Sequence, residues 1–466
     1  MTKEFFELMS NNYTSFLKLH KTSILLGIGS LLFYFAFAYD LVRDDFPKLL
    51  TLFVALFFLH YKLVQFQSWN LKFLLVIGIL FRFVFIFAEP NLSQDFYRFI
   101  WDGELIWAGY NPYIHIPNDL MQQPDFAIPN QAELYNGMGS LSAKHFSNYP
   151  PINQILFSIA VFFGGGSILG SIVAMRTLIL CTDIGILFFG QKLLQQFNLP
   201  KHAAFWYFLN PLVIIELTGN LHFEGVMLFF FIWSMYLISK GKWILASPIY
   251  AASIMVKLVP ILFLPLFLRY FGIKRSALFY TFVGLVCILL FLPFHDVAFV
   301  NNYAETIGLW FSNFEFNAGI YNGLKQIAVG LFDAKPWELI KVYGSWVVRI
   351  TILGTLLIAL LRKNETLDQV MLSMLMVLTG YYLLSTTVHP WYLVFLIALA
   401  CFTKYRFAIL WSLLVILSYY AYSKADYSEN LWLLAIEYLM VFAYLIYEIV
   451  GKDRKKLDFF KKYMPF

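Results

Sequence analysis

Residues 169–195 read LGSIVAMRTLILCTDIGILFFGQKLLQ, an apolar run long enough to cross a membrane as one helix. Such a helix needs about 20 apolar residues. Arg176 and Asp183 interrupt the run seven positions apart. Charge at membrane depth is costly, so we expect these two side chains to satisfy each other or groups on neighbouring helices.

The composition extends this interpretation to the whole chain. Of its 466 residues, 60% are hydrophobic and 13% are charged, whereas soluble domains carry about 25% charged residues. Strand-like alternation of polar and apolar residues is absent, which argues against an outer-membrane barrel. The sequence therefore predicts an all-α polytopic membrane protein. In such a protein the net charge of +6 reports topology and does not indicate a nucleic-acid partner.

Apolar runs of spanning length recur along the chain and predict about twelve full transmembrane helices. They lie at about 22–39, 47–61, 71–88, 169–195, 203–218, 225–239, 275–294, 339–361, 368–387, 390–403, 406–422 and 431–450. Two further stretches are incomplete. Residues 152–163 are short for a crossing, and residues 243–268 contain three prolines, with Lys257 in the middle. Basic residues flank both ends of 243–268, which predicts a broken helix or hairpin.

The distribution of charge predicts the orientation, because cytoplasmic loops are rich in Lys and Arg. The basic clusters expected inside are Lys201, 240–242, 269–275, Arg362–Lys363, Lys404–Arg406 and the tail 452–462. Residues 89–150 carry seven acids against two bases and form the first predicted outside loop. Residues 295–337 form the second. We expect one membrane domain over 1–466 in the cytoplasmic (inner) membrane, with both termini in the cytoplasm.

The first outside loop contains the motif SQDFYRFIWDGELIWAGYNPY at residues 93–113. Asp95 and Asp102 lie seven positions apart, so a helix would place them on one face, about 10 Å apart. That separation is too large for a shared proton and predicts different roles. Arg98 lies within ion-pair reach of both acids. A functional site at the membrane boundary and a solvated amphipathic helix are both compatible with this pattern.

Three other polar features stand out from the apolar background. The turn at residues 220–225 places His222 and Glu224 between two predicted spans, where they could bind a metal or sugar hydroxyls or simply form a polar turn. Lys257 is a cation in an apolar segment. Its side chain either extends to the membrane–water interface or binds the phosphate of a ligand. His389 begins His-Pro-Trp-Tyr, where the aromatic residues are typical of an interface.

The assembled pattern resembles the GT-C superfamily of glycosyltransferases, and within it the bacterial polyprenyl-phosphate-mannose-dependent mannosyltransferases, which are distantly akin to the GPI mannosyltransferase. The first-loop motif carries most of the resemblance. The other matches, in chain order, are Tyr149-Pro-Pro151, Arg176 with Asp183, Asn210-Pro211, Gly219-Asn220 with His222 and Glu224, Lys257-Leu-Val-Pro260, and His389-Pro-Trp-Tyr392.

The resemblance implies a GT-C-type helical bundle that transfers a sugar, with inversion, from a polyprenyl-phosphate donor to a lipid or glycan acceptor at the outer face. It implies mannose as the sugar and Asp95 as the general base. Gln94 stands where relatives often have a second acid. A divalent metal held by Asp95, His222 and Glu224 is therefore in doubt. Lys257 and Arg176 are the expected ligands of the donor phosphate.

The residues expected to bind substrate are Arg98, Asp102, Asn111, Tyr113, Asn220, His222, Glu224, Lys257 and His389. In this interpretation membrane lipids surround the bundle. The sequence does not establish a cofactor. A multi-pass transporter or lipid flippase is the alternative, since it would also combine about twelve spans with broken helices and buried charges. The long polar outside loops and the lack of a visible inverted repeat argue against it.

The predicted topology can be tested by cysteine labelling in intact cells, after the three native cysteines are replaced. We expect Ser142→Cys, in the first outside loop, to react with a membrane-impermeant maleimide, because that loop faces outward. Lys455→Cys, in the basic tail, should react only after permeabilisation. The reverse pattern would invert the topology.

Overall fold

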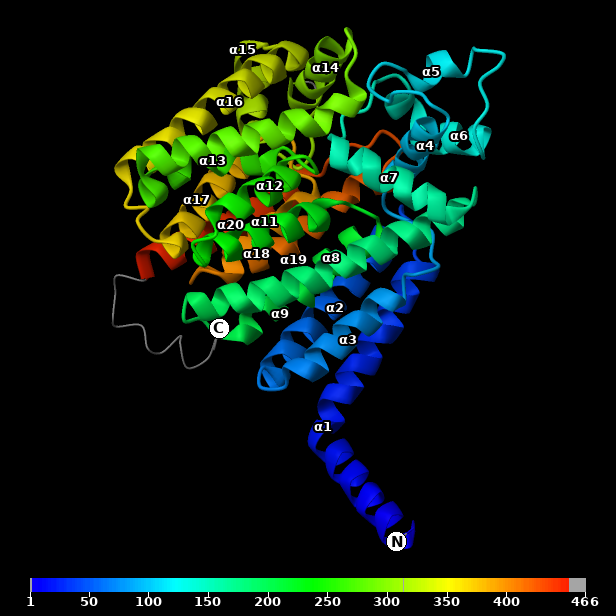
Figure 1. Cartoon of the computed structure of the whole chain (residues 1–466), viewed down its shortest axis with the longest axis vertical. Helices are drawn as coiled ribbons and strands as arrows, with labels where there is room; N and C mark the ends of the chain where they lie inside the picture. Colours follow the sequence, from blue (N-terminus) through cyan, green and yellow to red (C-terminus); the bar gives the residue numbers. More distant parts are fainter. Residues whose placement is uncertain (1, 313, 452–466) are drawn as a thin grey trace.

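The computed structural model describes residues 2–312 and 314–451 (Figure 1). Within these ranges the regular structure is helical, apart from one isolated bridge between Phe316 and Thr387. The all-α prediction is therefore confirmed. The basic tail at 452–462, which was used to predict a cytoplasmic C-terminus, lies outside the described residues.

The first half of the chain forms long apolar helices interrupted by shorter ones. In chain order the elements are α1 (Thr2–Tyr39), α2 (Phe46–Gln67), α3 (Leu71–Phe83), α4 (Asp95–Trp107), α5 (Pro117–Leu120), α6 (Gln131–Ala143), α7 (Pro151–Gly164), α8 (Ile168–Gln196), η1 (Lys201–Ala204), α9 (Phe205–Phe208), α10 (Pro211–Val213), η2 (Ile214–Gly219) and α11 (Glu224–Ser239). Pro117, Pro151 and Pro211 each lie in the first turn of a helix, where the missing N–H costs no hydrogen bond.

The second half repeats this alternation. Its elements are α12 (Trp243–Ile254), η3 (Val259–Phe267), α13 (Leu268–Phe291), η4 (Leu292–Phe294), α14 (Phe299–Ser312), α15 (Gly319–Phe332), α16 (Pro336–Leu361), α17 (Leu367–Leu384), η5 (Pro390–Tyr392), α18 (Leu393–Cys401), α19 (Phe407–Leu414), η6 (Val415–Ser423) and α20 (Leu431–Gly451). Helices α4, α5 and α6 gather at one end of the molecule, and the start of α1 projects from the other (Figure 1).

The number of long spans is smaller than the sequence predicted. In the described residues, seven helices are long and apolar enough to cross a membrane, or eight if the bent pair Pro211–Gly219 and Glu224–Ser239 counts as one. The predicted spans at 71–88, 203–218, 390–403 and 406–422 fold as shorter or broken helices. Proline explains part of this, because Pro211 lies inside the predicted span 203–218 and begins a new helix there.

The prediction of a broken helix or hairpin at residues 243–268 is confirmed. Helix α12 ends at Ile254, and η3 begins at Val259, so Lys257 lies in the turn between them. The two arms are joined by a hydrogen bond of 2.7 Å from the Tyr250 hydroxyl to the Pro260 carbonyl. Backbone of this irregular kind is tolerated in an apolar environment where protein covers it. The hairpin therefore positions Lys257 at its tip.

Helix α4 packs directly against α7. The close approach is possible because Gly103 has no side chain. A Cβ atom at Gly103 would lie 2.7 Å from the backbone carbonyl oxygen of Phe157, which is shorter than real contacts allow. The Phe99 and Phe157 rings stack in the same interface, with their centroids 4.6 Å apart. Close packing by a glycine and two aromatic rings thus holds the motif helix in one place.

Candidate functional site

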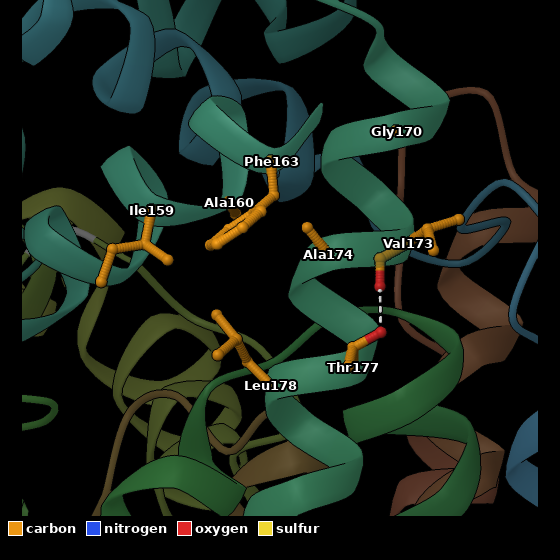
Figure 2. A pocket seen from close by; sticks show the side chains of 8 residues that line it. All are labelled: Ile159, Ala160, Phe163, Gly170, Val173, Ala174, Thr177 and Leu178. Atoms are coloured by element: carbon orange, nitrogen blue, oxygen red, sulfur yellow. Dashed lines mark hydrogen bonds between the residues drawn. The ribbon is translucent and has the colours of Figure 1, made fainter. Parts of the chain in front are cut away.

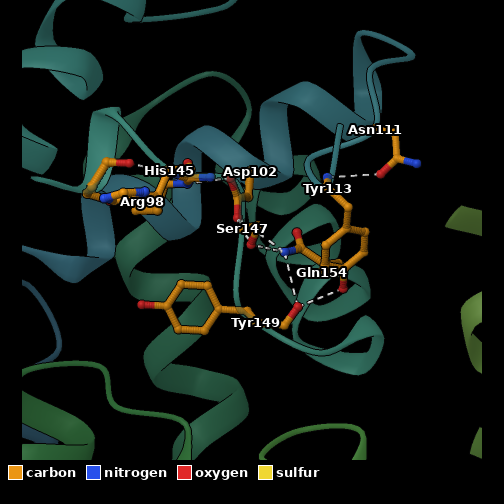
Figure 3. Close-up of polar contacts among 9 residues, drawn as sticks. Arg98, Asp102, Asn111, Tyr113, His145, Ser147, Tyr149 and Gln154 are labelled. Carbon is orange, nitrogen blue, oxygen red and sulfur yellow. Dashed lines mark hydrogen bonds and ion pairs between the residues drawn. The ribbon is translucent and has the colours of Figure 1, made fainter. Parts of the chain in front are cut away.

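A buried ion pair anchors the motif helix. The Arg98 Nε donates to Asp102 Oδ1 at 2.7 Å, and both side chains are buried. Asp102 Oδ2 accepts from the Ser147 hydroxyl at 2.6 Å and from Gln154 Nε2 at 3.1 Å (Figure 3). Arg98 Nη1 donates to the carbonyls of Ser142 and His145. The pair therefore joins α4 to residues 142–154.

These contacts correct two predictions about the motif. Arg98 was expected within reach of both acids, but in the structure it pairs with Asp102 and not with Asp95. Arg98 and Asp102 were also expected to bind substrate. Their bonding groups contact protein, apart from Arg98 Nη2, which is buried without a hydrogen-bond partner. The Asp102 side chain is 0% exposed. They are positioning residues, because a buried charge needs a fixed partner.

The end of the motif is likewise occupied by structural contacts. Asn111 Oδ1 accepts from the Tyr113 N–H at 3.0 Å, and its Nδ2 donates to the Phe294 carbonyl at 2.8 Å. The buried Tyr113 hydroxyl donates to the Tyr149 carbonyl at 2.6 Å (Figure 3). Asn111 and Tyr113 were predicted to bind substrate. In the structure they fix the loop after α4 against η4 and the segment that precedes α7.

Asp95 differs from every other acid of the motif. It begins α4, it is half-buried, and its carboxylate makes no hydrogen bond or ion pair with the described residues. Burial raises its pKa; Lys257 lowers this pKa, Glu224 raises it and Arg43 lowers it. A carboxylate with a raised pKa and open lone pairs is suited to accept a proton.

Lys257 and Glu224 form an ion pair beside Asp95. The Lys257 Nζ lies 3.0 Å from Glu224 Oε1, and the second oxygen of Glu224 is buried without a hydrogen-bond partner. The same ammonium lies 5.5 Å from the centre of the Tyr149 ring. The charge of Lys257 therefore meets a carboxylate of the protein.

His222 and His389 belong to one stack of rings. The Trp391 ring lies 3.8 Å from the His222 ring and 4.4 Å from the His389 ring, and Phe316 lies on His389 at 5.0 Å, all between centroids. Burial, with smaller contributions from Lys257 and Arg43, lowers the pKa of His389 to about 3. His389 is therefore neutral at physiological pH, and its ring extends an aromatic wall.

Glu216 contacts the polar turn at 220–225, and no signal in the sequence singled this residue out. Glu216 in η2 accepts from the Tyr419 hydroxyl at 2.6 Å and lies 3.5 Å from His222 Nε2. Asn220 Oδ1 accepts from the Leu92 N–H at 3.1 Å, which ties the turn to the segment before α4. Asn220 was predicted to bind substrate and is better described as a positioning residue.

The structure does not support Arg176 as a ligand of the donor phosphate. Its guanidinium is fully buried and donates to the backbone carbonyls of Thr218, Gly219, Ile86 and Ala88. Asp183 pairs with a neighbouring helix instead, since Arg82 Nε lies 2.7 Å from its Oδ2. The expectation that neighbouring helices satisfy these charges is therefore confirmed.

The predicted metal ligands do not form a metal site in the part of the chain that the structure describes. No group of three or more His, Cys, Asp or Glu residues there could hold an ion. Glu224 is engaged by Lys257, and the imidazole of His222 is turned to Glu216 and Trp391. No step proposed below uses a metal.

An apolar groove of about 390 Å³ lies between α7 and α8 (Figure 2). Its walls include Phe163 and Leu178, and its one hydroxyl, on Thr177, donates to the Val173 carbonyl at 2.8 Å. None of the groove residues is ionisable, so this groove cannot supply a base or bind a phosphate. The ionisable candidates lie elsewhere, at Asp95, Glu224 and Lys257.

Part of the chain is similar to a family of known enzymes. Residues 48–271 match the family model described as alpha-(1->6)-mannopyranosyltransferase, N-terminal domain. The chain thus resembles bacterial mannosyltransferases. The match covers just under half of the chain and includes Asp95, Glu224 and Lys257. The predicted resemblance to bacterial mannosyltransferases of the GT-C superfamily is confirmed.

A curated relative leads to the same family. Alpha-(1->6)-mannopyranosyltransferase A of Corynebacterium glutamicum is 22% identical over 196 residues, which are 41% of this chain. The aligned part spans 37% of the relative's length. The likeness therefore concerns part of each chain.

Asp102→Asn tests the structural role of the buried pair. We expect it to lower the free energy of unfolding by about 3–5 kcal/mol, because it leaves the Arg98 charge buried without its counter-ion. Thermal unfolding of the purified protein in detergent measures this. Asp119→Asn, an exposed acid of the same loop, is the control. An unchanged melting temperature in Asp102→Asn would contradict the anchoring role.

Proposed function

We propose that this protein is a membrane mannosyltransferase that moves mannose from a polyprenyl-phosphate donor to an acceptor hydroxyl on the outer face of the membrane, with inversion. The α-(1→6) linkage in the family description is the linkage that we propose. The observation that carries the proposal is the unpaired, half-buried carboxylate of Asp95 next to the Lys257–Glu224 pair.

In the proposed reaction Asp95 accepts the proton of the acceptor hydroxyl. The hydroxyl oxygen then forms a bond to the anomeric carbon, and the bond from that carbon to the phosphate oxygen breaks. The electron pair of the broken bond stays on the lipid phosphate. A base of this kind contributes about 10²–10⁴ to a rate, and a cation near the leaving oxygen stabilises its developing charge.

Lys257 is the cation that this mechanism places at the leaving phosphate. It stands at the tip of the hairpin formed by α12 and η3, and about 25% of its side chain is exposed. Glu224 holds the ammonium at 3.0 Å and so fixes where the charge lies. Tyr149 and the ring stack at His389 supply an aromatic surface of the type that sugars contact.

The match to a transferase family favours the enzyme over the transporter alternative. Reconstitution separates the two directly. Purified protein, labelled polyprenyl-phosphate mannose and a mannoside acceptor should give a labelled, longer product. Flux of the lipid or of a solute across the vesicle membrane with no glycosidic product would contradict the proposed function.

Asp95→Asn tests the assigned base. We expect a loss of about 10²–10⁴ in kcat, with the melting temperature and the donor affinity retained, because the carboxylate has no structural partner. Asp119→Asn should keep full activity. Near wild-type turnover in Asp95→Asn would remove this residue from the mechanism.

Two neighbours of Asp95 should move the acid limb of the pH profile in opposite directions. The reaction needs ionised Asp95, so kcat/KM should fall as the pH drops through its raised pKa. Lys257→Met removes a cation that lowers this pKa, so the limb should move to higher pH. Glu224→Gln removes an anion that raises it, so the limb should move to lower pH. Movement in the same direction in both variants would contradict Asp95 as the titrating group.

A further inference from the structure

Arg43 is a cation that has no charged partner among the described residues. It lies in the segment between α1 and α2, half-buried, with its Nε buried and without a hydrogen-bond partner. Two acids of the same segment are used elsewhere. Asp40 pairs with Lys48 at 2.7 Å, and Asp45 caps α2 by accepting from the Lys48 N–H. None of Asp40, Asp45 and the exposed neighbour Asp44 forms an ion pair with Arg43 in the described structure.

The guanidinium lies on the wall of the candidate site. Its central carbon is 3.6 Å from the centre of the Tyr422 ring in η6. Tyr422 in turn contacts Phe316, which lies on His389 in the ring stack described above. The positive charge also reaches the reactive group, because Arg43 lowers the pKa of Asp95.

Arg43 differs from Lys257 in having no ion-pair partner among the described residues. Lys257 is already paired with Glu224, whereas Arg43 and Asp95 have no ion-pair partner. A buried, unpaired cation is unfavourable unless an anionic group meets it. The planar guanidinium suits a phosphate, which it can bind through two parallel hydrogen bonds. The guanidinium lies over the Tyr422 ring, which fixes its position.

We propose that Arg43 binds the phosphate of the lipid-linked donor together with Lys257 and takes up the charge that forms as the phosphate leaves. This inference rests on the proposed function. Before transfer the donor is a phosphodiester with one negative charge. As the bond to the anomeric carbon breaks, its electron pair stays on the phosphate, which becomes a phosphomonoester of nearly two negative charges.

The transfer therefore moves negative charge from Asp95 to the phosphate. Asp95 gains the proton of the acceptor and becomes neutral in the same step, so the charge of the whole site is conserved. Arg43 interacts with an anion of growing charge, and it should bind the leaving phosphomonoester more tightly than the donor. Residue 43 lies before the segment 48–271 that matches the family model, so that match does not assign it.

Arg43→Gln and Arg43→Lys test this role, with Arg349→Gln as the matched control. Arg349 is exposed on α16 and also lies over an aromatic ring, 5.2 Å from the centre of Trp346. For each protein we would measure kcat, the donor KM, and the binding of a long-chain polyprenyl monophosphate in detergent by thermal shift. The binding measurement needs no turnover.

For Arg43→Gln we expect polyprenyl-monophosphate binding to weaken about 10- to 100-fold, the range for loss of hydrogen bonds to a charged group. The donor KM should rise by a smaller factor. Arg43→Lys should recover part of the binding, because it keeps the charge and loses the planar fork. Arg349→Gln should match the wild type. Unchanged monophosphate binding in a folded Arg43→Gln protein would overturn the proposal, as would an equal loss in Arg349→Gln.

The same data separate this inference from the proposed function. A wild type that transfers mannose, with an Arg43→Gln variant that binds the monophosphate normally, would refute the role of Arg43 alone. A wild type that binds the monophosphate through Arg43 and forms no glycosidic product would refute the transferase. If Arg43→Gln does not fold, a folded Arg43→Lys variant with wild-type affinity for both phosphates would overturn the planar two-bond contact.

Discussion

The buried Arg98–Asp102 ion pair is the constraint on which the site depends. It ties α4 to the segment at 142–154 and holds that helix against α7, where Gly103 permits close contact. The direction of α4 decides where its first residue, Asp95, lies. Since Asp95 has no partner of its own to fix it, its place beside Lys257 and Glu224 follows from contacts made two helical turns away.

The ionisable groups of the bundle divide by whether they have partners. Arg176, Asp183 and Arg82 are fully buried and bonded to protein groups, so they hold helices together. Asp95 and Arg43 are half-buried and lack charged partners. Pairing stabilises a charge in an apolar environment at the expense of its reactivity. The proposed roles in proton transfer and phosphate binding fall on the two groups that lack charged partners.

Interrupted helices position the residues of the candidate site. Glu224 begins α11 after the bend that follows η2, Lys257 occupies the turn of a hairpin, and His389 precedes the short element η5. An uninterrupted helix presents side chains along its flank, whereas a helix end can direct them into the bundle together with free backbone groups. The breaks that reduce the number of full spans are therefore the same features that build the site.

The sequence by itself determined the membrane class, the all-α fold, the motif helix, the hairpin around Lys257 and the family resemblance. These follow from local signals: apolar runs, prolines and a short motif. It did not determine which charges are paired. Arg98 had two acids within reach, Asp183 pairs with Arg82 about a hundred positions earlier, and Arg43 meets Tyr422 from the far end of the chain. Only the tertiary structure decides such partners, because pairing depends on distances that helix packing sets and that sequence separation does not encode.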